Sequence, residues 1–288
     1  MRLLRLGPPG KETPAVLVPG RENLAYDLSG LTPDIDGAFL RTLFQQTIAE
    51  AIDAGALPTI EVAGVRVGAP IARPHAIYAI GLNYADHAAE AAMELPAEPI
   101  VFSKAPNSLC GPTDDVRLPV GSVKGDWEVE LGVVIGLAAH ELSSQEQAAR
   151  CIAGYIAVND VSERAWQIER GGQWLKGKSF PTANPAGPWL VTPDEVGDVD
   201  SLRLRLSVNG SVKQDGTTAD MVFGPHYLVW YLSQFVRLEP GDLIDTGTPA
   251  GVGMGATPPV FLADGDIIEL SISGLGEHRT LVHVPATT

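Results

Sequence analysis

Two glutamates, Glu128 and Glu130, stand one residue apart at the start of the stretch DWEVELGVVIG, residues 126–136. In a strand, side chains at i and i+2 point to the same face, so both carboxylates project together while Val129 faces the other way. The LGVVIG that follows is apolar at both alternating sets of positions, which is typical of a strand buried on both faces. Two carboxylates at the mouth of such a strand repel each other unless a positive charge lies between them.

A divalent cation would remove this repulsion, because Mg²⁺ and Mn²⁺ prefer oxygen ligands. Such a site needs a third carboxylate, and Asp160 in GYIAVNDVSER follows the next apolar run, residues 155–158. The alternative interpretations are ordinary ones. The glutamates could lie on a solvated strand face, and an Asp after a strand is commonly a turn former or a helix cap. On these residues alone both interpretations stay open.

A second pair of titratable residues, His87 and Glu90, lies in the alanine-rich segment NYADHAAEAAMEL. Residues three apart share one face of a helical turn, so the two side chains could form a hydrogen bond. Without further information, an exposed helical face is the ordinary interpretation of such a segment. An imidazole beside a carboxylate is nevertheless what general-base chemistry requires.

Length and composition restrict the class of protein. The chain has 288 residues and 45% hydrophobic content, enough for a substantial core, and 31 Gly and 23 Pro against 6% aromatics favour a β-rich fold with few helices. A net charge of −15 argues against partners such as nucleic acid or an anionic membrane surface. Two cysteines, Cys110 and Cys151, form neither a disulfide framework nor a structural zinc site. No signal-length or membrane-spanning apolar run is evident, so we expect a cytoplasmic protein.

Apolar patterns and turn residues divide the chain into two units. Short strands and one helical run from Ala38 to Gly55 come first, followed by the proline-bearing connector at residues 68–75. We therefore predict a small N-terminal α+β domain, residues 1–70, and a second domain, residues 71–288. In the second domain Asn209-Gly210 predicts a hairpin turn. The apolar segment 226–236 predicts a helix, and we expect it in the core rather than at an interface because apolar residues surround most of it.

Competing motifs are weak. GVGMGA, residues 251–256, matches part of a dinucleotide pattern, but Thr257-Pro258-Pro259 follows where that motif needs a helix. The sequence contains no G-x-S-x-G, H-E-x-x-H or Walker A motif, which argues against serine hydrolases, zincins and P-loop ATPases. The remaining histidines show no ligand-like spacing, namely His75, His140, His226, His278 and His283.

Five segments occur in an order that resembles the fumarylacetoacetate hydrolase superfamily: AIGLNYADHAAE, DWEVELGVVIG, GYIAVNDVSER, KGKSF and DTGTPAGVG. The resemblance spans about Ala76 to Val282, nearly all of the second domain. It implies a β-rich α+β protein, whose catalytic domain is a mixed β-sheet roll with few helices. Members of the family are commonly homodimers.

The same resemblance implies roles for individual residues. Glu128, Glu130 and Asp160 match the three metal-binding carboxylates of the family, whose metal is usually Mg²⁺ or Mn²⁺. His87 and Glu90 match an acid–base pair on a segment that orders over the substrate. Lys178 in KGKSF matches a lysine that reaches the oxygens of the substrate. Substrate contacts are implied for four further residues: Tyr84, Arg164, Gln167 and Thr248.

By this resemblance the chain hydrolyses a C–C bond in a 2,4-dioxo acid of the acylpyruvate type and releases pyruvate. Many such enzymes carry arginine where this chain has Leu82, which suggests an uncharged distal end of the substrate, although Lys104 could supply a cation instead. The longer N-terminal domain and the segment GLNYADHAAE resemble those of bacterial members that act on 2,4-diketo-3-deoxy-L-rhamnonate or -fuconate. Three alternatives remain open, namely an oxaloacetate decarboxylase, a keto-acid isomerase and a non-catalytic metal-binding protein with a structural or regulatory role.

Overall fold

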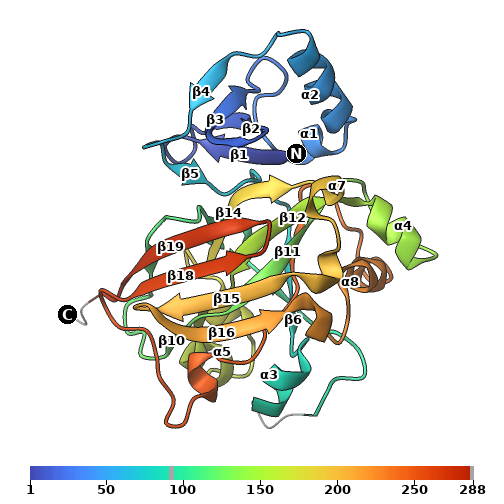
Figure 1. Ribbon diagram of the computed structural model, residues 1–288. Helices are drawn as coiled ribbons and strands as arrows, with labels where there is room; N and C mark the ends of the chain where they lie inside the picture. The colour runs from blue at the N-terminus through green and yellow to red at the C-terminus, as the bar shows by residue number, and fades with distance from the viewer. Residues whose placement is uncertain (91–93, 286–288) are drawn as a thin grey trace.

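The computed structural model describes residues 1–90 and 94–285 and shows a smaller N-terminal lobe on a larger one (Figure 1). Ala91–Met93, which belong to the alanine-rich segment NYADHAAEAAMEL, lie outside the described residues. Within the described residues, no helix has both the length and the apolar character needed to cross a membrane.

The N-terminal lobe is a small curved sheet covered by two helices (Figure 1). Its elements are β1 (Arg2–Leu6), β2 (Thr13–Val18), β3 (Arg21–Asp27), α1 (Gly37–Leu40), α2 (Phe44–Asp53), β4 (Thr59–Glu61) and β5 (Val67–Gly68). The single helical run expected here is broken in two. Phe39 and Phe44 are both buried with ring centroids 5.6 Å apart, yet five residues along one helix they would point about 140° apart. The break between α1 and α2 allows both rings to enter the same core.

One long mixed sheet runs through both lobes, in the strand order β4-β3-β2-β1-β14-β12-β11-β17-β6-β7. Its strands in the large lobe are β6 (Ile77–Gly81), β7 (Ile100–Lys104), β11 (Val129–Ile135), β12 (Ile152–Asn159), β14 (Asn184–Val191) and β17 (Leu243–Asp245), with β8 (Leu109–Cys110) beside β14. The lobes join where β1 pairs antiparallel with β14, Leu3 opposite Leu190. Strands β17 and β6 are parallel, whereas β11 and β12 are antiparallel.

A second sheet packs against the first and closes the core of the large lobe (Figure 1). It contains β9 (Val116–Arg117), β15 (Arg203–Val208), β16 (Ser211–Thr217), β18 (Ile267–Ile272) and β19 (Gly276–His283); the short strands β10 (Gly125–Asp126) and β13 (Ser162–Glu163) pair separately. The predicted hairpin is confirmed, because Asn209 and Gly210 join β15 to β16 with φ values of 51° and 74°.

Strand β11 is buried on both faces, as its sequence predicts. Val129, Leu131 and Val133 point into the core between the two sheets. Val134 points the other way, into a core that the large lobe shares with residues of the N-terminal lobe such as Leu3. Each fully buried aliphatic side chain of this kind stabilises the fold by about 1.5–3 kcal/mol relative to exposure. The strand that carries Glu130 is therefore held in place from both sides.

The remaining helices are short, as the composition predicts. They are α3 (Ala85–Glu90), α4 (Gln145–Arg150), α5 (Arg164–Ile168), α6 (Leu175–Lys178), α7 (Pro193–Val196) and α8 (Pro225–Leu232), with 3₁₀ turns at Pro106–Ser108, Val199–Ser201, Thr218–Asp220 and Gly253–Gly255. Helix α8 is a core helix on one face only. Leu228 and Leu232 are buried, whereas Tyr227 and Tyr231 stack on the outside and Phe235 is 66% exposed. The fold class expected from the sequence, β-rich α+β with a mixed sheet, is confirmed.

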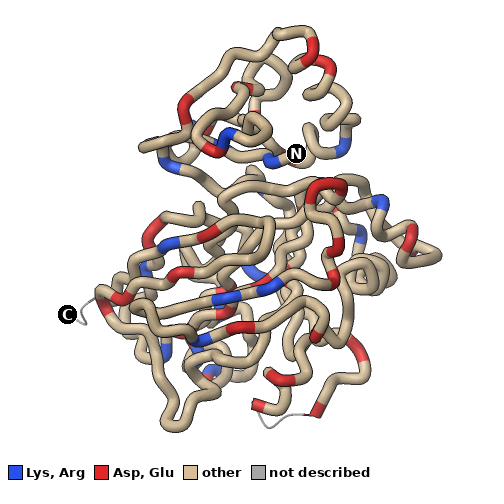
Figure 2. The backbone as a smooth tube through the Cα atoms, viewed as in Figure 1, with Lys and Arg blue, Asp and Glu red and all other residues tan. Residues whose placement is uncertain are grey.

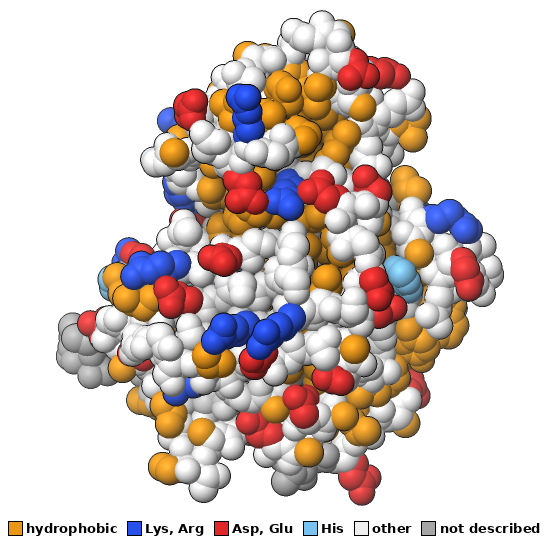
Figure 3. Space-filling model, viewed as in Figure 1, with side chains coloured by type: hydrophobic (Ala, Val, Ile, Leu, Met, Phe, Trp, Pro, Cys, Tyr) orange, Lys and Arg blue, Asp and Glu red, His pale blue; other side chains and the backbone are white. Residues whose placement is uncertain are grey.

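Acidic residues are spread over both lobes rather than gathered in one patch (Figure 2). On the face seen in Figure 3, basic side chains lie over β15 with acidic ones nearby. The surface charge of this face therefore marks no single binding surface, and the carboxylates discussed below are buried inside the large lobe.

Candidate active site

Three buried carboxylates meet where β11 begins and β12 ends. One oxygen from each of Glu128, Glu130 and Asp160 lies within 4.8 Å of the other two. The sheet register places them, because Val129 pairs with Asn159 and the Asp160 amide donates to the Glu128 carbonyl at 2.9 Å. Here the strand spacing of Glu128 and Glu130 has the consequence expected from the sequence: both carboxylates reach the same point. We call these three residues the carboxylate cluster.

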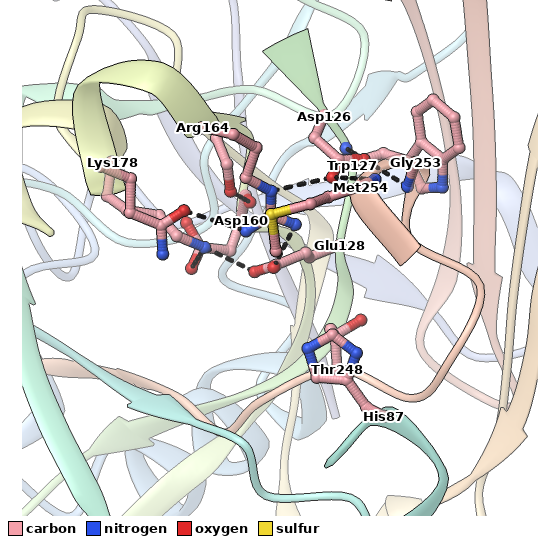
Figure 4. Close-up of polar contacts among 12 residues, drawn as sticks. His87, Asp126, Trp127, Glu128, Asp160, Arg164, Lys178, Thr248, Gly253 and Met254 are labelled. Atoms are coloured by element: carbon pink, nitrogen blue, oxygen red, sulfur yellow. Dashed lines mark hydrogen bonds and ion pairs between the residues drawn. The ribbon is translucent and has the colours of Figure 1, made fainter. Parts of the chain in front are cut away.

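Two cations bind the carboxylate cluster from one side (Figure 4). Lys178 Nζ lies 2.5 Å from Glu128 Oε2 and 2.7 Å from Asp160 Oδ2, and Arg164 Nη2 donates to Glu128 Oε1 at 2.7 Å. A third cation, Lys104 Nζ, pairs with Asp160 Oδ1. Burial alone would raise the pKa of Glu128, but Lys178 and Arg164 hold it below its ordinary value.

Glu130 is the member of the cluster with the least compensation. Burial, followed by the charges of Asp160 and Glu128, raises its pKa well above the ordinary value. Its hydrogen bond within the described part of the chain comes from a backbone amide, Gly247 N at 2.7 Å. Three carboxylates with one so poorly neutralised are a donor set that suits a hard divalent cation. The residues therefore fit the metal that the resemblance implies.

Helix α3 presents a histidine to the same site from another direction (Figure 4). His87 Nδ1 lies 3.2 Å from Glu90 Oε2. Burial would raise the pKa of Glu90, but the hydrogen bonds from His87 and the Gly251 amide lower it, so the carboxylate is ionised and accepts the Nδ1 proton. This arrangement leaves the lone pair on Nε2, the nitrogen required for a general base.

A cavity of about 100 Å³ joins the histidine to the cluster. Its polar end includes His87, Glu128, Glu130, Arg164, Gln167, Lys178 and Thr248, and its apolar walls include Ile80, Leu82, Phe102, Ile168, Trp174 and Met254. The rings of Phe102 and Trp174 meet edge to face with centroids 5.1 Å apart. Gly81 permits this wall, because a Cβ there would lie 2.6 Å from the Trp174 ring.

The structure brings most of the predicted substrate-binding residues to this cavity. Gln167 is held there by Arg164 Nη1, which donates to its Oε1 at 3.1 Å. Thr248 lines the cavity, but its hydroxyl donates to the Val129 carbonyl at 2.8 Å and accepts from Gln214 at 2.7 Å. Its side chain therefore also has a structural task, namely fixing the loop after β17 to β11.

Tyr84 differs from the other predicted substrate contacts. It is fully buried and is not among the residues that line the cavity. Its hydroxyl has no hydrogen-bond partner in the described part of the chain. Leu82, two residues earlier, does line the cavity and has a positive φ of 54°. The turn that it forms directs its own side chain, rather than that of Tyr84, to the wall.

The suggestion that Lys104 supplies a cation for the distal end of a substrate is wrong for this structure. Its side chain is buried, pairs with Asp160 and donates to the Ala183 carbonyl at 3.1 Å. It is not part of the cavity wall. Position 104 ends β7, and its ammonium group is taken up by Asp160 rather than left free for a substrate.

Two acidic residues near the site were missed by the sequence interpretation. Asp126 is fully buried and accepts a hydrogen bond from Arg164 Nε at 2.8 Å. Asp245 ends β17, and burial raises its pKa to about 7. The available signal was an aspartate within or beside an apolar run, but that pattern does not say which partner each side chain meets.

Comparisons with known proteins identify the family of this chain. The family model described as fumarylacetoacetate (FAA) hydrolase C-terminal matches residues 76–283. A protein from Burkholderia ambifaria that is named only as a hydrolase is 53% identical over 278 residues, which cover 96% of this chain and 97% of the relative.

Solved structures extend the comparison to the whole chain. Maleylpyruvate hydrolase from Sphingobium sp. SYK-6, in complex with manganese(II) and pyruvate, has a TM-score of 0.81 and 28% identity over 99% of this chain and 100% of that one. A probable 2-hydroxyhepta-2,4-diene-1,7-dioate isomerase from Mycobacterium abscessus has a TM-score of 0.83 and 32% identity with the same coverage. The match to the family model and these whole-chain similarities show that this chain belongs to the fumarylacetoacetate hydrolase superfamily.

Proposed function

We propose that this chain is a metal-dependent hydrolase that cleaves the C3–C4 bond of a 2,4-dioxo acid and releases pyruvate. The observation that carries the proposal is the position of His87, which is bonded to Glu90 and lines one small cavity together with two carboxylates of the cluster, Glu128 and Glu130, and two cations, Lys178 and Arg164. A base, an anion-binding region and a divalent metal site are the groups that such a cleavage requires.

Binding of the substrate falls to the polar end of the cavity. Lys178 and Arg164 supply positive charge for the substrate carboxylate and the 2-oxo group, and Gln167 adds a hydrogen-bonding group beside them. When Mg²⁺ or Mn²⁺ is bound by the carboxylate cluster, it supplies charge neutralisation and polarisation of a carbonyl group. Both lysine and arginine remain charged at neutral pH, because acidic neighbours raise the pKa of Lys178 and of Arg164 against the effect of burial.

Proton transfer falls to His87. With Nδ1–H held by Glu90, Nε2 accepts a proton from a water molecule, whose oxygen attacks the C4 carbonyl. The C3–C4 bond then breaks, its electron pair passes to C3, and the leaving group is the enolate of pyruvate. Lys178 lies where it can stabilise the negative charge of this enolate, and protonation of C3 completes the reaction.

The apolar wall supports a substrate whose distal end carries no charge. Leu82, Phe102 and Trp174 offer this end no ion-pair partner, and the described cations that line the cavity, Lys178 and Arg164, lie at its polar end, where they face the substrate carboxylate and 2-oxo group. A short chain with a methyl group, as in 2,4-diketo-3-deoxy-L-rhamnonate or -fuconate, suits such a wall and a cavity of about 100 Å³. The products would then be pyruvate and lactate.

A keto-acid isomerase is the second candidate, because one of the matched structures is named as an isomerase. Oxaloacetate decarboxylation is a related alternative, since loss of carbon dioxide also leaves the enolate of pyruvate. Neither reaction needs an attacking water, so His87 would have another role in both.

The test is pyruvate release from a panel of substrates, each with Mg²⁺, with Mn²⁺ and with EDTA. The panel contains a 2,4-diketo-3-deoxy sugar acid, acetylpyruvate, an acylpyruvate with a distal carboxylate, and oxaloacetate. We expect EDTA-sensitive release from the first two and at least about tenfold slower release from the dicarboxylate. Turnover of oxaloacetate alone would identify a decarboxylase, and conversion of an unsaturated keto acid without cleavage would identify an isomerase.

A further inference from the structure

The glycine-rich segment that follows β17 contacts two parts of the site. One is helix α3 with His87 and Glu90, and the other is Asp126, which is bonded to Arg164 beside the carboxylate cluster. We call these parts the two halves of the site. We call Gly251–Gly255 the glycine loop; it corresponds to the GVGMG that resembles part of a dinucleotide motif. No α-helix follows it in the described structure, so it does not bind phosphate in that manner. Its backbone amides are instead taken up by carboxylates of the protein itself.

On one side the glycine loop holds helix α3, which carries His87 and Glu90. The Gly251 amide donates to Glu90 Oε1 at 3.0 Å and to Oε2 at 3.2 Å, and the neighbouring Ala250 amide donates to Asp86 Oδ2 at 3.3 Å. Close approach depends on glycine, because a Cβ at position 255 would lie 2.3 Å from Glu90 Cδ. The orientation of Glu90, and through it of His87, therefore rests on this loop.

On the other side the glycine loop is held by Asp126 (Figure 4). Asp126 Oδ1 accepts from the Gly253 amide at 2.7 Å, and Oδ2 accepts from the Met254 amide at 3.0 Å. The Oδ2 atom also accepts from Arg164 Nε at 2.8 Å. Next to it, Trp127 Nε1 donates to the Gly251 carbonyl at 3.0 Å. One fully buried carboxylate thus joins the loop to the substrate-binding arginine.

Bonding at Nε fixes the plane of the Arg164 guanidinium group. Its two outer nitrogens are then directed to Glu128 at 2.7 Å and to Gln167 at 3.1 Å. Each of these contacts lies in the cavity, whereas Asp126 lies behind it. Asp126 therefore acts on the substrate only through other residues.

We propose that Asp126 is a positioning residue that couples the two halves of the site, because it holds both Arg164 and the glycine loop on which Glu90 and His87 depend. Its kinetic consequence rests on the proposed function. The ordinary alternative is a purely structural aspartate, whose loss would lower stability and leave the geometry of the site unchanged.

Two variants and one control test the coupling. Gly255→Ala disturbs the loop on the Glu90 side, and Asp126→Asn keeps the volume but removes the charge that holds Arg164. Gly30→Ala is the control, because a Cβ at Gly30 meets nothing within 4 Å and the residue lies in the N-terminal lobe. We expect Gly255→Ala to lower kcat by about 30-fold with little change in KM, and Asp126→Asn to lower kcat similarly and raise KM about tenfold. In the double variant the two effects on kcat should not multiply.

A readout that needs no turnover separates this proposal from the proposed function. The chain has five tryptophans, and the ¹⁵N–¹H indole resonance of Trp127, assigned with Trp127→Phe, reports its bond to Gly251. Both Asp126→Asn and Gly255→Ala should shift this resonance, and Asp126→Asn should also weaken pyruvate binding in the presence of Mn²⁺ about tenfold by calorimetry. An unmoved resonance with wild-type pyruvate binding, or multiplicative effects on kcat, would refute the coupling. Absence of pyruvate release by the wild-type enzyme would refute only the proposed function.

Discussion

The carboxylate cluster and helix α3 face the same cavity but are held in different ways. The cluster is built on β11 and β12, which are buried on both faces, and Lys104, Lys178 and Arg164 surround it. Helix α3 has six residues, and the side-chain bonds that tie it to the loop after β17 come from Asp86 and Glu90. Binding geometry is thus set by sheet register, whereas the position of the base is set by a few hydrogen bonds.

The largest effect should follow from removing the base. We expect His87→Asn to lower kcat by about 10²- to 10⁴-fold, because among the described residues no other group that lines the cavity can take its place as a neutral base. The affinity for Mn²⁺, measured by calorimetry, should stay within about threefold of wild type, because His87 lies on helix α3 and not in the carboxylate cluster. A large loss of metal affinity would show that the two halves are not separate.

The converse variant, Glu130→Gln, should damage binding and spare the fold. Loss of one of three carboxylate ligands should weaken Mn²⁺ binding by more than about 100-fold. The metal-free protein should melt no lower than wild type, because burial, together with the negative charges around Glu130, already raises its pKa and opposes its ionised form. Calorimetry and thermal unfolding of the same preparation provide both measurements. A folded Glu130→Gln protein with unchanged affinity would rule out the assigned site.

A smaller effect is expected from Glu90→Gln, which tests how α3 is held. The oxygen of the new glutamine side chain can still accept the hydrogen bond from the Gly251 backbone N–H, but the side chain no longer stabilises a positive charge on His87. We therefore expect kcat to fall by about 10- to 100-fold with KM nearly unchanged. Gln46→Glu, in the exposed part of α2, changes charge in the N-terminal lobe and serves as the control. An equal loss in both variants would point to a general electrostatic effect.

The smallest effect on activity is expected for a change in the second sheet, where His278 on β19 does not line the cavity. His278 is buried, where burial lowers its pKa to about 4, and its Nε2 bonds to the Gly187 carbonyl at 2.8 Å. In the unfolded chain His278 takes up a proton near pH 6.5, whereas in the folded chain it stays neutral down to about pH 4. The free energy of unfolding therefore falls as the pH drops from about 6.5 to 4. Between pH 7 and pH 5 this residue should lower the free energy of unfolding, measured with denaturant, by about 2 kcal/mol. His278→Gln should remove that part of the pH dependence, and an unchanged slope would contradict the assignment.

The sequence predicted the carboxylate cluster better than its surroundings for a physical reason. The two-residue period of a strand determines that Glu128 and Glu130 point the same way, and antiparallel pairing brings Asp160 beside them. These are local rules. In contrast, the partners of Asp126, Lys104 and Trp174 come from segments distant in the chain, and no local period specifies them.

The N-terminal region shows a second limit of local patterns. Periodicity predicted one helix over residues 38–55, but the burial of Phe39 and Phe44 in one core divides it. The proline-bearing segment 68–75 predicted a boundary between domains. In the structure one sheet runs through both lobes, because β1 pairs with β14. Strands that lie far apart in the chain, such as β1 and β14, carry no local sequence pattern that shows they will pair.

The pairing of β1 with β14 also bears on how the chain could be shortened. Removal of the first 70 residues would expose the edge of β14 and one apolar face of the long mixed sheet, where Val134, Ile156 and Leu190 pack against N-terminal residues. An uncovered edge strand beside an apolar surface is a template for association with other chains. The larger lobe expressed alone should therefore aggregate, even though it contains every residue of the site.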